Sequence, residues 1–360
     1  MRYVDEFRNP RDILKVAAKI EGIAPRRKIN IMEVCGTHTQ NFHRFGLNKL
    51  LPKSINFISG PGCPVCVSPQ GYIDAAIALS RRKDVIIITF GDMLRVPGTG
   101  SCLEKERAKG ARVRIVYSPL ESLNLARDNP DKKLVFLAVG FETTAPAIAL
   151  SIIAAKDTGV RNLYFLTSLK LVLPVMRHLL SDKKLNVDAF LSPGHVSAII
   201  GTEGYGFVAE KYKAPCCIAG FEPLDIMEGI YLILRQLKDN KTKVDNQYAR
   251  VVAKRGNLKA QKIIRRVFKN SNAIWRGFGR IPLSGLKIRD EFSGFDAKRV
   301  FNLKTAGKDA PSKCRCAQIL KGLIRAQDCP LFLKSCTPDN PVGPCMVSSE
   351  GACNAHFKYR

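Results

Sequence analysis

LVFLAVGFETTAPAIALSIIAAKDTGVRNLYFLT, residues 134–167, decides the fold class. An apolar run at 134–139 ends at a glycine turn, a helical stretch follows from Thr143 to Asp157, and a second apolar run begins at 163. Two parallel strands need a crossover of a dozen or more residues between them, and this segment has that length and pattern. It therefore predicts a parallel sheet of the α/β kind.

The same alternation extends along the chain on both sides of this segment. Several helical stretches begin near a proline, which favours a helix start. The further strands are expected at 29–34, 55–59, 85–90, 112–117, 187–191 and 216–220, and the further helices at 69–82, 119–128, 169–181 and 223–238. In such sheets, ligands bind at the carboxyl ends of the strands.

Two short internal echoes indicate two similar α/β units. ISGPGCPV (58–65) resembles LSPGHVSA (191–198), and AVGFETTAP (138–146) resembles IAGFEPLDI (218–226). Each member of these pairs follows an apolar strand. The repetition fits two related parallel-sheet α/β domains.

The expected domain organisation follows from these units and from a change of rhythm after about residue 240. A basic helical pattern at 245–269 is followed by a loop-rich stretch around Trp275. We expect an N-terminal helix packed on the C-terminal domain, two α/β domains, and a smaller, mostly helical and loop-rich C-terminal domain. Their expected bounds are 1–24, 25–118, 119–222 and 223–360.

The charge balance is strongly basic. The 360 residues include 58 Lys+Arg and 31 Asp+Glu, a formal net charge of +27. In the denser basic stretch at 241–289, aromatic residues do not alternate with the basic run in its middle, and no zinc-finger, RNA-recognition or homeodomain signature occurs. We therefore expect a general surface property or a dock for an acidic protein, with no nucleic acid bound.

The N-terminus, MRYVDEFRNPRDILKVAAKI, carries charges throughout and has no secretory pattern. No apolar run approaches the roughly 18 residues that a membrane span needs. These features predict a cytoplasmic protein that binds no membrane.

Twelve cysteines in a chain that is expected in the cytoplasm indicate metal or redox chemistry rather than a disulfide scaffold. Four in the C-terminal region have the spacing C-x14-C-x6-C-x16-C and two more lie nearby: Cys314, Cys329, Cys336 and Cys353, with Cys316 and Cys345. Zinc ribbons usually supply close C-x2–4-C pairs, which this set lacks. A cubane iron–sulfur cluster can take four thiolates from separate loops, so we expect a C-terminal iron–sulfur domain. Cys345 is an alternative to Cys353 as a ligand, and structural zinc or buried free thiols remain open.

Three further cysteines follow expected strands near the N-terminus. Cys35 stands in MEVCGTHTQ, where Gly36 permits a sharp turn. His38 lies one helical turn further on, where it could orient a ligand or act as a base; a buried cysteine beside a hydrogen-bonded histidine is the structural alternative. Cys63 and Cys66 form GPGCPVC before an expected helix, whose N-terminus favours thiolate. We expect catalytic roles for Cys35, His38, Cys63 and Cys66, with the C-x-x-C pair redox-active or iron-binding.

Other polar residues have weaker contexts. His195, Glu142 and Glu222 follow strand ends and could line the same cleft, although turn residues and capping carboxylates are common there. Cys216 and Cys217 open an expected buried strand, which indicates a packing role. Neither a Walker motif, a Rossmann glycine fingerprint nor a Gly-x-Ser-x-Gly elbow occurs in the sequence.

Taken together, these motifs resemble those of the HypD family of hydrogenase maturation proteins. The matching stretches run from near the start of the chain to its end. They are MEVCGTHTQ (32–40), SGPGCPVC (59–66), FGDMLRVPG (90–98), GFETTAPA (140–147), LSPGHVSAIIG (191–201), AGFEPLDI (219–226), CRCAQILKG (314–322) and PVGPCMVSSEGACNAHFKY (341–359).

The resemblance implies a scaffold on which the Fe(CN)2CO centre of nickel–iron hydrogenase is assembled. It implies that Cys35 binds the Fe(II) that carries cyanide and carbon monoxide, with Cys63 and Cys66 as the redox-active or iron-supporting pair. It also implies that Cys314, Cys329, Cys336 and Cys353 hold a 4Fe-4S cluster. The implied partners are the small chaperone HypC, which shares the iron, and HypE, which delivers cyanide made through HypF.

Two other function classes remain open. An iron–sulfur-dependent protein disulfide reductase of the ferredoxin–thioredoxin reductase kind would use Cys63 and Cys66 and would not need Cys35. A plain binding module would hold structural zinc. Both iron-based functions require that folding bring Cys63 and Cys66 close to the terminal cysteines.

Overall fold

Two separate parallel sheets build the molecule, within residues 4–182, 185–305 and 313–359, which the computed structural model describes. Sheet A has the strand order β2 (Ile55–Ser59), β1 (Ile29–Glu33), β7 (Ala189–Pro193), β8 (Cys216–Ala219), β9 (Val244–Asn246). Sheet B has the order β4 (Val113–Ile115), β3 (Val85–Thr89), β5 (Lys133–Gly140), β6 (Leu163–Leu169). All neighbouring strands within the two sheets run parallel, so the predicted α/β class is confirmed.

Helices cover the sheets and bury their apolar faces. On sheet A, α1 (Pro10–Glu21) packs on α10 (Pro223–Lys238), and both contribute to one apolar core with β1 and β7. On sheet B, α5 (Glu121–Asp128) and α6 (Ala145–Asp157) form a second core. A third core joins the two sheets to the C-terminal segment. The remaining helices are α2 (Gly36–Arg44), α3 (Gln70–Ser80), α4 (Leu103–Ala108), α7 (Val172–Ser181), α8 (Gly194–Ile200), α9 (Gly206–Glu210), α11 (Leu258–Val267), α12 (Ala297–Val300), α13 (Cys316–Leu320), α14 (Pro344–Val347) and α15 (Ala352–Lys358).

The sheets do not follow the sequential domains expected from the sequence. The expected domain at 25–118 supplies β1 and β2 to sheet A but β3 and β4 to sheet B, and the expected domain at 119–222 is divided in the same way. The chain changes sheets after β2 because α3 packs on β3 rather than leading back beside β2. The N-terminal helix α1 does contact residues of the expected segment 223–360, but it does so through α10, which covers sheet A.

The basic segment 245–269 is not the single helix that its pattern predicts. β9 ends at Asn246 and α11 begins only at Leu258, where the Asn257 side chain accepts a hydrogen bond from Ala260 N at 3.0 Å. Gly256 has φ +64, and a Cβ there would come within 2.4 Å of Ile199 O. The chain therefore turns sharply against its own backbone before the helix, which charge periodicity does not reveal.

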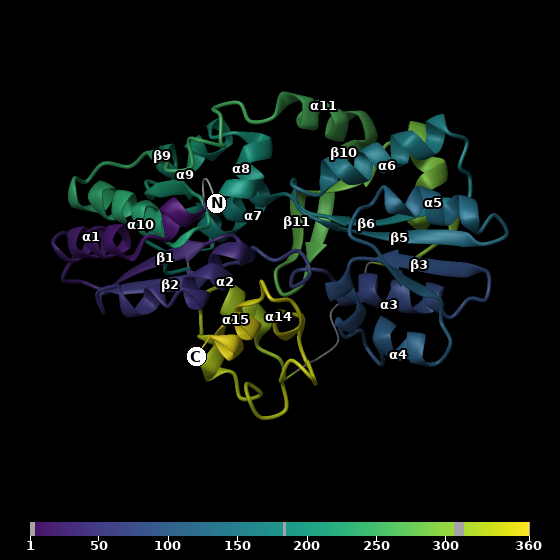
Figure 1. Cartoon of the computed structure of the whole chain (residues 1–360), viewed down its shortest axis with the longest axis horizontal. Helices are drawn as coiled ribbons and strands as arrows, with labels where there is room; N and C mark the ends of the chain where they lie inside the picture. Colours follow the sequence, from purple (N-terminus) through teal and green to yellow (C-terminus); the bar gives the residue numbers. More distant parts are fainter. Residues whose placement is uncertain (1–3, 183–184, 306–312, 360) are drawn as a thin grey trace.

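The stretch around Trp275 is an antiparallel hairpin rather than a loop. It consists of β10 (Phe268–Trp275) and β11 (Gly279–Ile288). The indole of Trp275 is fully buried, and its Nε1–H donates to Ser284 Oγ at 2.8 Å. The hairpin lies between the two sheets in Figure 1 and contacts β6 and α7.

The C-terminal segment is small, with short helices and loops, as predicted. α15 packs on α2, and α13 contacts β2. Figure 1 shows this yellow segment beside α2, so the last helices lie next to one of the first. Within the described residues, no helix is both long and apolar enough to cross a membrane.

The order of sheet A creates a topological switch point. From β1 the chain continues to β2 on one side, whereas β7 leads to β8 and β9 on the other. Connections that leave neighbouring strands in opposite directions open a crevice at the carboxyl ends, where α/β proteins bind ligands. In this chain the switch point lies at the carboxyl ends of β1 and β7.

Candidate functional site

Cys35 lies at this switch point, directly after β1, and caps the N-terminus of α2. Gly36 N donates to Gly62 O at 3.0 Å, so the loop after β2 lies against the loop after β1. A Cβ on Gly62 would come within 2.2 Å of Cys35 N. The glycine therefore permits a contact that brings Cys63 beside the Cys35 segment.

The Cys35 thiol is buried and protonated. Burial raises its pKa to about 12, and the Glu350 carboxylate adds to the effect, whereas the backbone N–H groups of His38 and Thr37 oppose it. Glu350 comes from the C-terminal segment and accepts a hydrogen bond from Thr37 Oγ1 at 2.7 Å. A metal ion bound at Cys35 would displace the thiol proton, because the thiolate is the ligand.

Glu33 fixes the turn that carries Cys35. One carboxylate oxygen accepts from Cys35 N at 2.8 Å, and the other accepts from the Thr39 hydroxyl. Burial raises the pKa of Glu33 to about 8. Sequence reasoning did not select Glu33 or Glu350, although both lie inside the motifs MEVCGTHTQ and PVGPCMVSSEGACNAHFKY.

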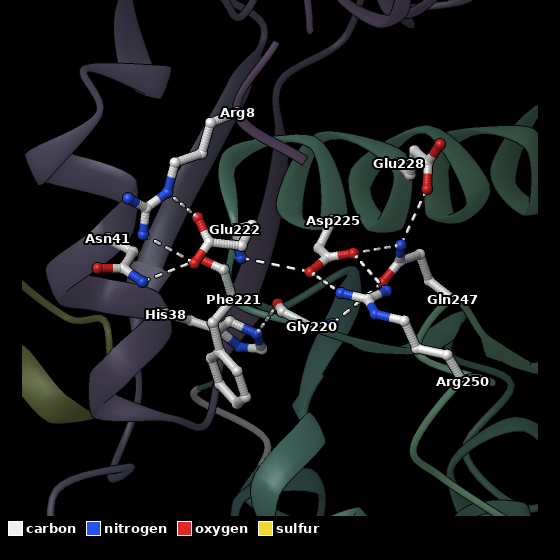
Figure 2. Close-up of polar contacts among 10 residues, drawn as sticks. All are labelled: Arg8, His38, Asn41, Gly220, Phe221, Glu222, Asp225, Glu228, Gln247 and Arg250. Atoms are coloured by element: carbon white, nitrogen blue, oxygen red, sulfur yellow. Dashed lines mark hydrogen bonds and ion pairs between the residues drawn. The ribbon is translucent and has the colours of Figure 1, made fainter. Parts of the chain in front are cut away.

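His38 contacts the loop after β8. Its Nε2–H donates to Gly220 O at 2.8 Å, and its ring centroid lies 4.8 Å from that of Phe221 (Figure 2). Burial lowers the pKa of His38 to about 4, so the ring is neutral. In the described part of the chain no hydrogen bond joins this ring to Cys35, and Nδ1 is buried without a partner.

The loop that holds His38 is itself anchored. Asn41 Nδ2 donates to Phe221 O at 2.9 Å, and His195 stacks on Phe221 with 3.9 Å between ring centroids. Figure 2 shows Arg8 reaching this loop, where its Nη2 donates to Glu222 Oε1 at 3.0 Å. Glu222 also forms a capping box with Asp225 at the start of α10. Glu222 and His195 thus support the loop, which agrees with the structural role that the sequence left open for them.

An ion pair between a buried carboxylate and a partly exposed arginine completes this anchor. Arg250 donates to both carboxylate oxygens of Asp225, at 2.8 Å and 2.6 Å. Gln247 bridges Asp225 and Glu228, and its side-chain oxygen accepts from Gly220 N at 3.1 Å (Figure 2). The position of the His38 ring therefore depends on side chains from α10 and from the segment after β9.

Cys63 and Cys66 are both buried, and they face the C-terminal segment. Cys66 N donates to Cys63 Sγ at 3.2 Å. The Cys66 thiol lies 3.9 Å from Pro344 O and contacts the thiol of Cys345. Burial raises the pKa of Cys66 well above its usual range. The C-x-x-C pair and the terminal cysteines are therefore neighbours, as both iron-based functions require.

The terminal thiols are arranged around Cys316. Its sulfur lies 3.1 Å from Cys314 Sγ and also contacts Cys345 and Cys353. A Cβ on Gly343 would come within 2.4 Å of Cys314 Sγ and 2.8 Å of Cys316 Sγ, so a glycine is needed beside these sulfurs. Cys345 joins this group to Cys66 and forms a continuous path of thiols.

The four cysteines expected as cluster ligands differ in how close they lie to the other thiols. Cys314 and Cys353 contact Cys316, and Cys336 accepts a hydrogen bond from Val342 N at 3.4 Å. The structure gives the Cys329 thiol no hydrogen bond to another described cysteine. Across 4–182, 185–305 and 313–359, no three His, Cys, Asp or Glu side chains form a ready site for one metal ion.

The donor chemistry of this unit suits an iron–sulfur cluster, since six thiols gather in one short segment. Sequence spacing named Cys345 as an alternative cluster ligand and gave Cys316 no role, and it could not show that both sulfurs lie between others. Cys216 and Cys217 lie in the buried strand β8, and Cys216 Sγ is 3.2 Å from Ser192 Oγ. Their predicted packing role agrees with this position.

These features define a cysteine-rich α/β protein in which a buried thiol at a switch point is joined to a C-x-x-C pair and a terminal thiol cluster. A family model named HypD, described as "Hydrogenase formation hypA family", matches residues 11–360. The chain therefore belongs to the HypD family of hydrogenase maturation factors, as its motifs predicted.

Curated relatives match over nearly their whole length. The hydrogenase maturation factor HypD of Azotobacter vinelandii is 45% identical over 100% of this chain and 97% of its own. The HypD of Escherichia coli (strain K12) is 43% identical over 100% of this chain and 98% of its own. A putative hydrogenase expression/formation protein of Methanocaldococcus jannaschii is 43% identical over 98% of each chain.

Proposed function

We propose that this chain is the scaffold on which the Fe(CN)2CO centre of nickel–iron hydrogenase is assembled. Membership of the HypD family supports this proposal, and the observation that carries it is the contact between Cys66 and Cys345. That contact joins the C-x-x-C pair, close to Cys35, with the sulfur-rich terminal segment. The proposed partners are HypC, which shares the iron, and HypE, which delivers cyanide.

Cys35 is proposed as the thiolate that receives the iron cargo. Iron(II) with cyanide and carbon monoxide ligands is low-spin, and thiolate is a suitable donor for it. The high pKa of the empty thiol means that iron binding releases a proton. Glu33 and Gly62 hold the surrounding backbone, so the direction of the sulfur is set before the iron arrives.

Cys63 and Cys66 are proposed as the electron source for cyanide transfer. Transfer of a cyano group to iron as cyanide breaks its bond to the carrier atom on HypE and consumes two electrons. Closing the dithiol to a disulfide releases two electrons and two protons; the carrier atom takes up one proton and the other goes to solvent. Cys345 and Cys316 can then reduce that disulfide by exchange and become a disulfide themselves. A 4Fe-4S cluster held by the terminal cysteines would supply electrons one at a time when bound.

The decisive experiment is infrared spectroscopy of the full chain, co-expressed with HypC and purified without oxygen. The unchanged protein is expected to show cyanide and carbonyl bands, and Cys35→Ser is expected to lose them while keeping its fold. Cys102→Ser is the matched control: Cys102 is also buried but precedes α4, where serine is a favoured cap. Absence of the bands in the unchanged complex would refute the scaffold function.

The competing functions give different results in the same samples. Membership of the HypD family gives no support to a general protein disulfide reductase, which would keep full dithiol turnover in Cys35→Ser. A structural zinc module would contain zinc and neither iron nor sulfide on metal analysis. Replacing Cys345 with serine is expected to leave iron at Cys35 but to stop reduction of the C-x-x-C disulfide, which thiol trapping measures.

A further inference from the structure

A cavity of about 410 Å³ lies at the carboxyl end of β6. The last residues of β6, the hairpin β10–β11, the start of α3 and the segment that enters α12 line it. Its described lining includes none of the cysteines, so it is a different place from the thiol site. Carboxyl ends of parallel strands are where α/β proteins bind ligands.

The charges around this cavity are unbalanced. Among the described residues, four basic side chains line it, Lys170, Arg280, Lys287 and Lys298, against one acid, Asp296. The Asp296 carboxylate caps α12, where it accepts a hydrogen bond from Lys298 N at 2.9 Å. Because this one carboxylate already accepts a hydrogen bond from the backbone, the cavity keeps a strong excess of positive charge.

Lys170 is the most confined of these cations. Its side chain is 3% exposed, and its Nζ donates to Ile274 O at 2.7 Å. Among the described residues no carboxylate pairs with it. Burial lowers the pKa of Lys170 to about 7, and the nearby charge of Lys298 adds to the effect. Buried lysines are normally paired, so this one lacks an anion.

The neighbouring hydroxyl also lacks a partner. Ser168 Oγ is buried, lines the same cavity, and makes no hydrogen bond within the part of the chain that the structure describes. Ser168 is 6% exposed. A buried hydroxyl without a partner is costly, which indicates that the cavity normally contains an acceptor.

We propose that this cavity binds a tetrahedral dianionic oxyanion, the phosphoryl group of a small metabolite. Its charge would offset the excess of cations, and its oxygens would accept from Ser168 Oγ and Lys170 Nζ. Lysine binds phosphate as a point charge, and a dianion gains more from several lysines than a single carboxylate does. This inference does not depend on the proposed scaffold function.

Binding should be linked to proton uptake. The ionisable groups facing Lys170 are Lys298, Asp296, Arg280 and Lys287, with Tyr72 kept neutral because burial raises its pKa well above its usual range. A bound anion favours the ammonium form of Lys170. The affinity is therefore highest below pH 7 and falls as the pH rises through about 7.

Isothermal titration of the full-length protein, purified without oxygen with its metals, tests this proposal. Sulfate is the probe because it stays a dianion at these pH values, and chloride keeps the ionic strength constant. We expect saturable binding of sulfate, with competition by inorganic phosphate but not by acetate. We also expect the protein to take up protons when sulfate binds slightly above pH 7. Titrations in buffers of different ionisation enthalpy measure this uptake. Ser168→Ala and Lys298→Gln should each weaken sulfate binding roughly tenfold or more.

Lys241→Gln is the matched control, because Lys241 is exposed and does not line the cavity. It should bind sulfate as the unchanged protein does. The proposal is overturned if sulfate binding does not saturate above the chloride background. It is also overturned if both cavity variants bind sulfate normally while their thermal unfolding is unchanged, or if acetate competes as well as phosphate.

Discussion

Replacing Gly62 with alanine tests whether the contact between the first two loops of sheet A positions Cys35. The new Cβ would lie 2.2 Å from Cys35 N, 2.3 Å from Cys35 Cα and 2.5 Å from Val34 C. All three are backbone atoms, so no flexible side chain can move aside. To bring the new Cβ to an ordinary van der Waals distance from these atoms, the two loops must move apart by about 1 Å.

The expected cost has two parts. Overpacking of this kind costs about 1–3 kcal/mol. Parting the loops also weakens the hydrogen bond from Gly36 N to Gly62 O, worth about 1 kcal/mol. We therefore expect Gly62→Ala to lower the free energy of unfolding by roughly 2–4 kcal/mol and to reduce iron retention at Cys35. Urea unfolding by circular dichroism measures the first effect, and iron analysis of the anaerobic HypC complex measures the second.

Gly100→Ala is the control for this substitution. A Cβ added at Gly100 would meet no atom within 4 Å, and Gly100 has no positive φ, so alanine should change the unfolding free energy by less than about 1 kcal/mol. If Gly62→Ala unfolds at the same urea concentration as Gly100→Ala and retains iron equally well, the loop contact does not position Cys35.

Three further predictions concern stability, each measured by urea unfolding. Asp225→Asn should cost about 1.5–3 kcal/mol because it removes the buried carboxylate charge to which the partly exposed Arg250 donates two hydrogen bonds; an unchanged midpoint contradicts this. Ser284→Ala should cost about 1–3 kcal/mol by leaving the Trp275 indole N–H without its acceptor, and a neutral result would show that another acceptor replaces it. Burial raises the pKa of Glu142 from 4.5 to about 7, so the folded carboxyl keeps a proton that the unfolded one releases. As the pH rises between those values, this group should lower the free energy of unfolding by up to about 3 kcal/mol. Glu33, whose pKa burial raises to about 8, contributes a slope of its own, so the pH profile of Glu142→Gln should be shallower than that of the unchanged protein; parallel profiles contradict the assignment.

Local patterns in the sequence predicted the elements well. The segment at 134–167 forms β5, α6 and β6, with parallel pairing of the two strands. The prolines at 69, 119 and 223 lie at or just before the first turns of α3, α5 and α10. Strand and helix starts depend on nearby residues, so one sequence contains enough information to place them.

The assignment of strands to sheets could not be predicted in the same way. The echo between 58–65 and 191–198 suggested two separate domains, yet both stretches leave strands of sheet A. Which sheet a strand joins depends on which surface its connecting helix covers, and that is a long-range property. The hairpin around Trp275 was missed because its strands carry several polar residues and pair mainly with each other, apart from one bridge between Gly285 and Lys170.

The sequence predicted where the motif cysteines lie relative to the strands better than it predicted which side chains meet in space. The motif cysteines at 35, 63 and 66 follow strands of sheet A, as expected. The bridging position of Cys345 and the approach of Glu350 to Cys35 depend on how the final segment folds back over α2. Spacing along the chain cannot show which of six terminal sulfurs faces the C-x-x-C pair.

The return of the last residues to the first strands has a consequence for synthesis. Cys35 is made more than 300 residues before Cys345 and Glu350. Since domains generally fold as they emerge, the early strands must wait for much of the chain before their neighbours in sheet A exist. A polypeptide that has not yet reached Glu350 thus lacks part of the surroundings of the Cys35 thiol, which the proposed scaffold function needs in place before iron can bind.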